Sequence, residues 1–297
     1  MYVKTNDKSI PYKVIAAVCL IIAAGLLLLP AWIRNDRDFE LTMLDIGQGD
    51  CFLIRADGHS ILIDGGGQPA DATEMAENVV LPYMRTLGID ELDIVFNTHP
   101  DNDHIGGLFA VIDEMPTKEL CVYSGYADSE KQQKLLRLAE ERAVSVSSAA
   151  AGQVFALSDD FTVTVLSPQA GEHYTEDSYN EGSLVLHIKY RELDVLLTGD
   201  LNGAEMMTAT DGLDCADIDV LQMPHHGSSN NYNAEWYDNF APQAVLVSVG
   251  RDNKYGHPGS DVIDYWQDRG IRIYRTDQDG ACRIIYNDDT LSIHTVL

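Results

Sequence analysis

The sequence predicts an α/β fold, and three observations indicate this class. Short apolar runs typical of buried strands alternate along the chain with segments of helical periodicity. These segments form two strand-rich halves, residues 39–115 and residues 161–297, and each half also carries helices. Several of the apolar runs end directly in an aspartate or a histidine. The carboxyl ends of strands are where open sheets usually place their sites.

The composition bounds the class of protein. A length of 297 residues is ample for a sizeable core, and 45% of the residues are hydrophobic. The formal net charge is −27. Such an acidic surface repels polyanions at range and lacks the basic face of nonspecific nucleic-acid binders. The five cysteines include no C-x-x-C pair, so no zinc ribbon or redox motif is indicated, although an exported domain could pair two of them.

The N-terminal part predicts a membrane anchor. Residues 14–33 are almost unbroken in apolar character and match the roughly 20 residues that a spanning helix needs. Three lysines in the short basic segment 1–13 favour an inside start. We therefore expect a single-pass protein of the cell membrane with an extracytoplasmic catalytic domain, residues 38–297. A cleaved signal peptide, and hence a secreted protein, is the alternative, although no clear A-x-A cleavage site follows the run.

The first half is expected to contain several strands and a helix at residues 72–87, and the chain turns helical again over residues 105–113. The dipeptide Asp57-Gly58 predicts a tight hairpin turn. Helical periodicity over residues 72–87 predicts a helix that Gly88 ends. The strand patterns lie at residues 39–44, 51–55, 60–64 and 92–97.

The rest of the chain repeats this alternation. Residues 129–142 predict an amphipathic outer helix, and residues 171–182 form a polar loop. The remaining strand patterns lie at residues 118–123, 144–149, 161–167, 183–190, 195–198, 218–223, 244–249, 271–274, 281–287 and 291–294.

The loop after the strand at residues 92–97 carries the strongest chemical signal. It reads Thr-His-Pro-Asp-Asn-Asp-His, so that His99, Asp101, Asp103 and His104 supply two imidazoles and two carboxylates. All four are metal-ligand types. A polar turn that only caps the next helix would explain one aspartate and one histidine. Four such groups on one loop would repel or compete without a cation, so the loop predicts a metal site.

Three further strand ends carry the same residue types. Asp200 follows the strand at residues 195–198, and His225 and His226 follow the strand at 218–223. His257 follows the strand at residues 244–249 after a short loop. Each has a structural explanation by itself, such as helix capping by Asp200. Together they predict that four strand ends contribute to one site.

The loop motif His-x-Asp-x-Asp-His resembles the metallo-β-lactamase superfamily signature His-x-His-x-Asp-His, with Asp101 in place of the second histidine. With the blocks Asp-Ile-Gly-Gln-Gly-Asp at residues 45–50 and Ile-Asp-Gly-Gly at residues 63–66, this variant resembles the hydrolase domain of ComEC-type DNA-uptake proteins. It is also similar to related choline-phosphate esterases. The resemblance covers about residues 39–260 and implies an αββα sandwich with its metal site at the seam of two sheets.

The resemblance implies a binuclear metal site and its ligands. The two metal ions would be zinc or manganese, because the binding site of the first ion is rich in oxygen ligands. Asp64 would hold the loop at residues 98–104, here called the metal loop, in place by hydrogen bonds. The usual third-block histidine is not obvious, and residues 180–185 stand in its place, with His173 and His187 as alternatives. The implied ligands are His99 and Asp101 for one ion, Asp103, His104 and His226 for the other, and Asp200 as the bridge.

Three residues are predicted to take part in catalysis: Asp103, His225 and His257. His225 would face the substrate or support a ligand, although its role and that of His226 could be reversed. His257 would donate a proton or contact a phosphate. Ser228 and Asn253 are weaker candidates for holding substrate oxygens.

The function that the resemblance implies is an exported binuclear phosphodiesterase or nuclease, with DNA as the first substrate. Two alternatives stay open: a phosphoesterase acting on surface polymers or choline-phosphate groups, and a lactone or thioester hydrolase. A non-catalytic binding protein would require a lost site, and the complete set of ligand types argues against it.

Overall fold

The computed structural model describes residues 39–67 and 73–296. Residues 38–297 form one compact unit, separate from residues 1–37. The predicted basic segment 1–13 and the anchor at residues 14–33 lie outside the described residues.

The predicted membrane localisation is corrected. Within residues 39–67 and 73–296, no helix combines the length and apolar character that crossing a bilayer requires. Even α5 (Glu130–Glu141) has 12 residues, or about 18 Å against a hydrocarbon core of about 30 Å. The prediction of a single-pass membrane protein is therefore not retained.

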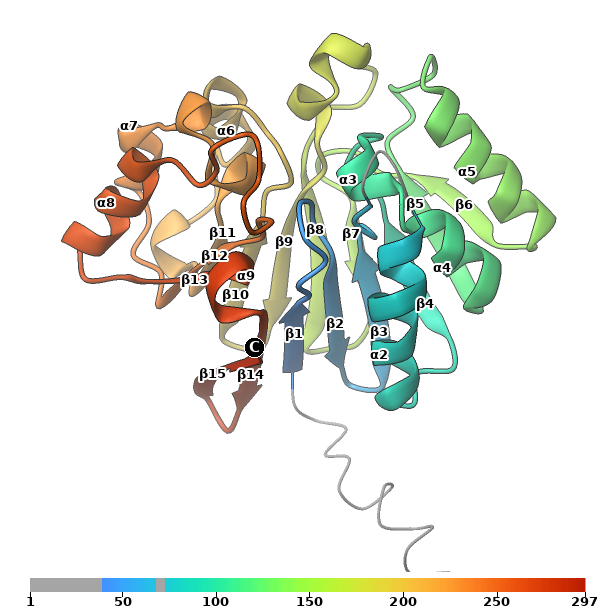
Figure 1. Ribbon diagram of the computed structural model, residues 1–297, viewed down its shortest axis with the longest axis horizontal. Coiled ribbons are helices and arrows are strands. Elements are labelled where there is room, and N and C mark those ends of the chain that lie inside the picture. Colours follow the sequence, from blue (N-terminus) through green and yellow to red (C-terminus); the bar gives the residue numbers. More distant parts are fainter. Residues whose placement is uncertain (1–38, 68–72, 297) are drawn as a thin grey trace, which may run out of the picture. The chain divides into compact units, whose positions relative to one another are not determined.

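Two mixed β-sheets form the centre of the unit (Figure 1). The first has eight strands in the order β15-β14-β1-β2-β3-β4-β5-β6, and the second has seven in the order β13-β12-β11-β10-β9-β8-β7. The first sheet consists of β1 (Phe39–Met43), β2 (Phe52–Ala56), β3 (His59–Ile63), β4 (Leu92–Phe96), β5 (Thr117–Val122), β6 (Ser145–Ser148), β14 (Ala281–Asn287) and β15 (Thr290–Val296). The second consists of β7 (Val154–Ala156), β8 (Phe161–Ser167), β9 (Val185–Tyr190), β10 (Leu193–Leu197), β11 (Val220–Gln222), β12 (Ala244–Val247) and β13 (Arg272–Arg275).

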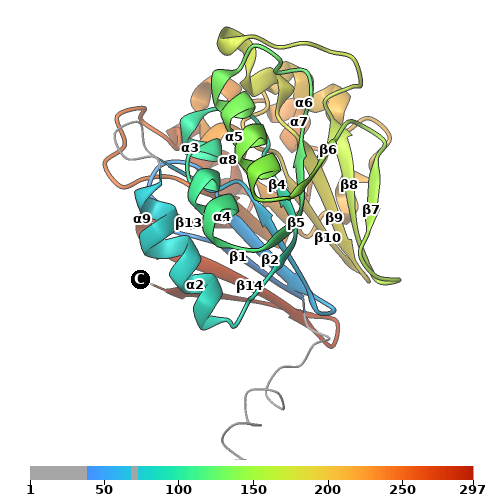
Figure 2. The same ribbon diagram turned by 90° about the vertical axis from the view of Figure 1, so that its right-hand side faces the viewer.

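Helices cover the outer face of each sheet (Figures 1 and 2). One buried cluster joins the inner faces of the two sheets, including Phe39 and Phe96 from the first and Phe161 from the second. A second cluster lies between the first sheet and its helices, and a third lies between the second sheet and its helices. The predicted αββα sandwich is therefore confirmed. The helices are α2 (Leu81–Thr86), preceded by the π-helical turn η1 (Ala76–Val80), α3 (Asn102–Ile105), α4 (Leu108–Glu114), α5, α6 (Gly203–Ala209), α7 (Ala234–Tyr237), α8 (Ser260–Asp268) and α9 (Thr276–Asp279).

The two sheets do not correspond to the two halves of the sequence. The C-terminal strands β14 and β15 join the first sheet, where β14 pairs antiparallel with β1 and Met43 faces Cys282. This pairing protects the edge of β1, which would otherwise present unpaired backbone groups. The three-residue strand β7 is too short to have a recognisable sequence pattern.

Local sequence signals account for several elements. The hairpin turn is confirmed: Asp57 and Gly58 adopt φ angles of 49° and 81°, as a two-residue hairpin turn requires. Helix α5 begins where the Ser129 hydroxyl accepts a hydrogen bond from the Gln132 amide. The four described cysteines are free thiols.

Parallel pairing brings the predicted site loops to one end of the unit. Strand β4 runs parallel to β3 and β5 in the first sheet, and β11 runs parallel to β10 and β12 in the second. The loops that leave the carboxyl ends of parallel strands emerge at the same edge of a sheet. The loops after β4, β10, β11 and β12 carry the predicted site residues.

Candidate metal site

The structure brings the six predicted ligand residues together. They come from the loop after β4, the end of β10 and the turn η5 (Pro224–Gly227) after β11. His99, His104, Asp200 and His226 are almost completely buried.

Asp200 lies at the centre of this cluster. Its Oδ1 atom is 3.3 Å from His104 Nε2. Its Oδ2 atom is 3.8 Å from His99 Nε2 and 3.5 Å from His226 Nε2. It does not cap the following helix α6, because the N-cap residue there is Asn202. Asp200 therefore contacts ligand-type atoms from both sheets.

The remaining carboxylates divide the cluster into two groups. Asp101 Oδ2 is 3.7 Å from His99 Nε2, whereas Asp103 Oδ2 is 3.6 Å from His226 Nε2. Ligand atoms of His99, His104 and Asp200 lie within 4.8 Å of one another, as do those of Asp103, His104 and His226. The two groups share His104, and Asp200 Oδ2 lies near both His99 and His226, so the ligand-type residues form one continuous cluster.

Several atoms of this cluster are buried without a hydrogen-bond partner among residues 39–67 and 73–296. A buried polar atom left unpaired costs about 1–3 kcal/mol, so such a cluster of unpaired atoms calls for a ligand. They are His99 Nε2, His104 Nε2, His226 Nε2 and Asp200 Oδ1. The residues therefore fit the divalent ions that the fold implies.

The local electrostatic field also favours a cation. Burial lowers the pKa of His104, but the Asp200 and Asp64 carboxylates outweigh it and hold that pKa well above its usual value. Burial raises the pKa of Asp101, and the neighbouring Asp103 and Asp200 carboxylates add to the increase. Carboxylates that stabilise the protonated form of an imidazole, and that repel one another, also attract a divalent cation.

The second ring nitrogen of each buried histidine is held by the protein. His104 Nδ1 donates to Asp64 Oδ2 at 2.8 Å, and His226 Nδ1 donates to the Ser248 carbonyl at 2.8 Å. His99 Nδ1 lies 3.3 Å from the Ser183 hydroxyl. Holding Nδ1 in this way leaves Nε2 free and fixes the ring orientation, as in protein metal sites generally.

Asp64 braces the metal loop, as predicted. Besides the bond from His104, its carboxylate accepts hydrogen bonds from Asn97 Nδ2, the Thr98 amide and the Thr98 hydroxyl, at 3.0, 2.8 and 2.6 Å. Its backbone has a positive φ of 56°, which aspartate tolerates better than most residues.

Replacing Asp64 by alanine is expected to destabilise the folded state by about 3 kcal/mol, because several buried donors lose their acceptor at once. Urea unfolding of the full chain measures this change. Asp64→Asn, which keeps an acceptor oxygen, is expected to lose less stability. A shift below about 1 kcal/mol for Asp64→Ala would contradict the bracing role.

Asp50 is a site residue to which the sequence assigned no role. Its side chain is buried, and Gln222 Nε2 donates to its Oδ2 atom at 2.5 Å. Its Oδ1 atom lies 3.5 Å from His226 Nδ1. The only signal in the sequence is the Gly-Gln-Gly turn before it, because Gln222 and His226 are far away along the chain.

The two neighbouring histidines point in different directions. Both have positive φ angles, 51° for His225 and 56° for His226. Left-handed conformations are uncommon for residues other than glycine and often mark functional sites. His226 is buried against Asp103 and Asp200, whereas the His225 side chain is 28% exposed, with Nε2 3.4 Å from Asn180 Nδ2. The geometry thus favours His226 over His225 as the ligand.

Residues 180–185, which stand where the superfamily usually has its third-block histidine, reach the cluster through Ser183. The Ser183 hydroxyl accepts a hydrogen bond from the Asp200 amide at 3.2 Å. The alternative histidines lie elsewhere: His187 Nε2 is 2.6 Å from Asp194 Oδ1, and His173 is exposed. Neither belongs to a described group of metal-ligand atoms.

A cavity of about 130 Å³ opens on the cluster. Its lining residues are Gln48, Asp101, Asp103, Asn180, Asp200, His225, His226, Tyr255 and His257. Burial, with repulsion from His225 and His226, lowers the pKa of His257 to about 4, so its imidazole is neutral near pH 7. A neutral imidazole can donate a hydrogen bond to a phosphate, but it does not carry the additional proton that a general acid gives to the leaving group.

Asn253 and Ser228 do not line this cavity. The Asn253 side chain instead bonds to backbone groups of its own loop. The Ser228 hydroxyl accepts a hydrogen bond from the Asn230 amide. The structure therefore gives these two side chains no place in the cavity over the cluster, and their predicted role stays a prediction.

The fold and this cluster define a class of protein, and a family model agrees. The chain belongs to the metallo-β-lactamase superfamily, whose model matches residues 44–250. Members with this fold are generally metal-dependent hydrolases, and the fold implies divalent metal ions.

Within the superfamily, the chain is similar to ComEC-type competence proteins. ComE operon protein 3 of Bacillus subtilis is 31% identical over 261 residues, which cover 84% of this chain and 33% of that protein. Recombination protein 2 of Haemophilus influenzae is 28% identical, with 86% and 30% covered. Competence protein ComA of Neisseria gonorrhoeae is 27% identical, with 83% and 32% covered. The chain spans about a third of the length of these relatives.

Solved structures share the fold at low sequence identity. A mutant of the CmlA β-hydroxylase matches with a TM-score of 0.53 and 15% identity, covering 82% of this chain and 53% of that one. Zn²⁺-bound PqqB from Methylobacterium extorquens matches with a TM-score of 0.52 and 12% identity, covering 81% and 87%.

Proposed function

We propose that this chain is a binuclear metal-dependent phosphodiesterase that acts on nucleic-acid strands. One observation carries the proposal: the buried Asp200 carboxylate lies within 3.3–3.8 Å of imidazoles from two groups of ligand-type residues. A carboxylate shared in this way is suited to bridge two ions.

In this proposal the cluster holds the two ions as the resemblance implies. His99 and Asp101 would hold one ion, and Asp103, His104 and His226 would hold the other, with Asp200 shared by both. When bound, two such ions activate water, polarise a phosphoryl oxygen and stabilise the leaving oxygen. Zinc and manganese are both suitable, because the ligands combine imidazoles with carboxylates. The zinc-bound PqqB structure, which shares the fold, supports zinc as one candidate.

The chain's own residues bind and orient the phosphate. His225 and Asn180 line the cavity on the side of Asp200, and His257 lines it as well. These side chains can donate hydrogen bonds to phosphoryl oxygens. Any charge that attracts an anion to this cavity would come from the divalent ions rather than from these side chains.

The choice of nucleic acid rests on the competence-protein relatives. Asp101 at the second motif position, in place of the superfamily's usual histidine, also favours phosphoesters over carbonyl substrates. The net charge of −27 weighs against broad electrostatic binding. We therefore propose that the protein cleaves nucleic-acid strands held at a narrow site and does not bind DNA nonspecifically over a broad surface.

The test uses the full chain purified without chelator. Bound zinc and manganese are quantified, and hydrolysis is measured with bis(4-nitrophenyl) phosphate and with single- and double-stranded DNA. We expect about two ions per chain and cleavage of both substrate types. We expect Asp103→Ala to lose one ion and on the order of 10³-fold in rate, the loss of several kcal/mol of metal assistance.

Asp159→Ala is the matched control, because Asp159 is an exposed aspartate outside the cluster. If the small diester is hydrolysed but DNA is not cleaved, the proposed substrate class changes from nucleic acid to surface polymers or small diesters. Two bound ions with no diester cleavage would refute the proposal and direct the search to lactones and thioesters.

A further inference from the structure

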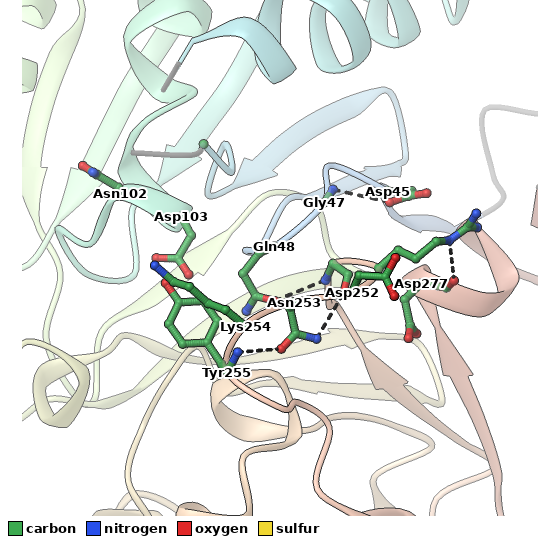
Figure 3. Close-up of a pocket in the computed structure, with 13 residues that line it drawn as sticks. Asp45, Gly47, Gln48, Asn102, Asp103, Asp252, Asn253, Lys254, Tyr255 and Asp277 are labelled. Atoms are coloured by element: carbon green, nitrogen blue, oxygen red, sulfur yellow. Dashed lines mark hydrogen bonds between the residues drawn. The ribbon is translucent and has the colours of Figure 1, made fainter. Parts of the chain in front are cut away.

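A second, larger cavity adjoins the candidate metal site (Figure 3). Its volume is about 690 Å³, within the usual range of ligand pockets. We call it the side groove. Gln48, Asp103 and Tyr255 line both the side groove and the smaller cavity over the metal cluster. A substrate whose phosphate lies at the cluster can therefore extend into the side groove.

The loop at residues 250–257 forms one wall of the side groove and is held firmly. Asn253 Nδ2 donates to the carbonyls of Gly250 and His257, at 3.0 and 2.7 Å. Asn253 Oδ1 accepts from the amides of Tyr255 and His257, at 3.2 and 3.1 Å. The Gly250 amide also donates to Gln48 Oε1 on the opposite loop. These bonds give the wall a fixed shape before any ligand binds.

Tyr255 presents an aromatic ring on this wall. The residue is 53% exposed, although most aromatic residues of the unit are buried. Its ring is nearly parallel to that of His257, with an interplanar angle of 13° and a centroid distance of 5.8 Å. One side of the ring is thus supported by the site itself. An exposed, supported ring next to a phosphate site is the arrangement on which single-strand binding proteins stack bases.

Lys254 and Arg251 also line the side groove. Neither has a carboxylate within 4.0 Å among residues 39–67 and 73–296. Arg251 Nε donates to the Asp277 carbonyl, and Lys254 Nζ lies 5.1 Å from the centre of the Tyr255 ring. Unpaired cations are notable in a chain with a net charge of −27.

Figure 3 shows Lys254 and Tyr255 at the end of the side groove next to Asp103. The acidic groups Asp45 and Asp277 lie at the other end. Asp277 is already paired with Arg275. Lys254 and the Tyr255 ring therefore lie at the end of the side groove that adjoins the metal cluster, whereas Arg251 bonds to Asp277 at the other end.

We infer that Tyr255 and Lys254 form a subsite for the nucleotide next to the scissile phosphodiester. The base lies on the Tyr255 ring, and Lys254 leaves its weak contact with that ring to bind the phosphate of the same nucleotide. Stacking on a side chain requires a base that is not stacked in a duplex, so the subsite selects single strands. This inference rests on the proposed phosphodiesterase function and deepens it.

The first test measures binding rather than cleavage. A fluorescent single-stranded deoxythymidine oligonucleotide with phosphorothioate linkages is titrated with the full chain in the presence of Mn²⁺, and anisotropy gives Kd. Tyr255→Ala is expected to raise Kd about tenfold, the usual effect of removing one stacking ring, whereas Tyr255→Phe retains binding. Tyr232→Ala is the matched control, because Tyr232 is an exposed tyrosine that does not line the side groove. Equal Kd values for the parent chain and Tyr255→Ala would overturn the inference.

The second test isolates the phosphate contact of Lys254. Affinity for a single strand falls with salt, with a slope of about 0.7 in log Kd per log salt for each phosphate contacted. Lys254→Met is expected to reduce this slope by about 0.7. Lys134→Met, which removes an exposed lysine of α5 outside the side groove, is expected to leave it unchanged. An unchanged slope in Lys254→Met would overturn the contact.

The two proposals fail in different ways. The subsite is overturned if cleavage of bis(4-nitrophenyl) phosphate and of the oligonucleotide fall equally in Tyr255→Ala, or if duplex DNA binds as tightly as the single strand. It is supported if the loss for the oligonucleotide exceeds the loss for the chromogen by about tenfold. The proposed function fails if the parent chain, loaded with metal, cleaves neither substrate, whatever the binding data show.

Discussion

Replacing Asp200 by alanine is expected to abolish binuclear metal binding and to lower diester hydrolysis on the order of 10³-fold or more. The physical reason is the position of its carboxylate. Its two oxygens approach His104 on one side and His99 and His226 on the other, so its removal weakens both groups at once. The measurements are metal content by mass spectrometry and kcat/KM with bis(4-nitrophenyl) phosphate. Asp200→Asn, which keeps the size but not the charge, is expected to show the same loss of metal.

Asp159→Ala controls for the loss of one carboxylate from this acidic chain, and circular dichroism checks that the Asp200 variants fold. The Asp200 backbone amide bonds to Ser183 Oγ and is unaffected by either substitution. A folded Asp200→Ala chain that keeps two ions and loses less than about tenfold in rate would exclude the bridging role.

His226→Ala and His225→Ala are expected to separate a metal ligand from a substrate contact. His226→Ala removes a buried ring between Asp103 and Asp200, so one ion is lost and the rate falls on the order of 10³-fold. His225→Ala removes a partly exposed ring at the cavity wall, so both ions remain and the rate falls about 10²-fold. The reverse pattern of metal loss would exchange the two assignments.

His187→Gln is the control for this pair. His187 lies in β9 of the second sheet, where it bonds to Asp194 rather than to the metal cluster. It is expected to keep both ions and the parent rate. Metal loss in His187→Gln would mean that stability changes alone lower metal content, and the comparison of His225 with His226 would then have to be made at matched stability.

Much of the fold and of the site could be predicted because the signals are local. The apolar runs predicted β1, β4 and β8 almost to the residue, and Asp57-Gly58 predicted the hairpin turn. The run from His99 to His104 packs four ligand-type groups into one short loop. Four ligand-type groups in one short loop are close together whatever the tertiary structure around the loop. The sequence alone therefore indicated a metal site.

Other features depend on contacts between distant residues, and no local pattern encodes these. Asp50 meets Gln222 across 172 positions, and Ser183 meets His99 across 84. Strand β14 lies beside β1 in the first sheet, although it follows every strand of the second sheet in sequence. The membrane prediction had the opposite weakness. It rested on the length and apolar character of residues 14–33 and on the lysines before them, and no spanning helix was found in the described part of the chain.

The sequence by itself determined the α/β class, the superfamily motif and the chemical types of the ligands, because periodicity and residue clustering are properties of short segments. Only the tertiary structure decided that Asp200 lies among imidazoles from two loops, that His226 rather than His225 is buried, and that Tyr255 lies beside the cluster. These outcomes follow from the parallel pairing that brings four strand ends together and from backbone angles at residues 225 and 226. Both are set by packing between elements that are far apart in the chain.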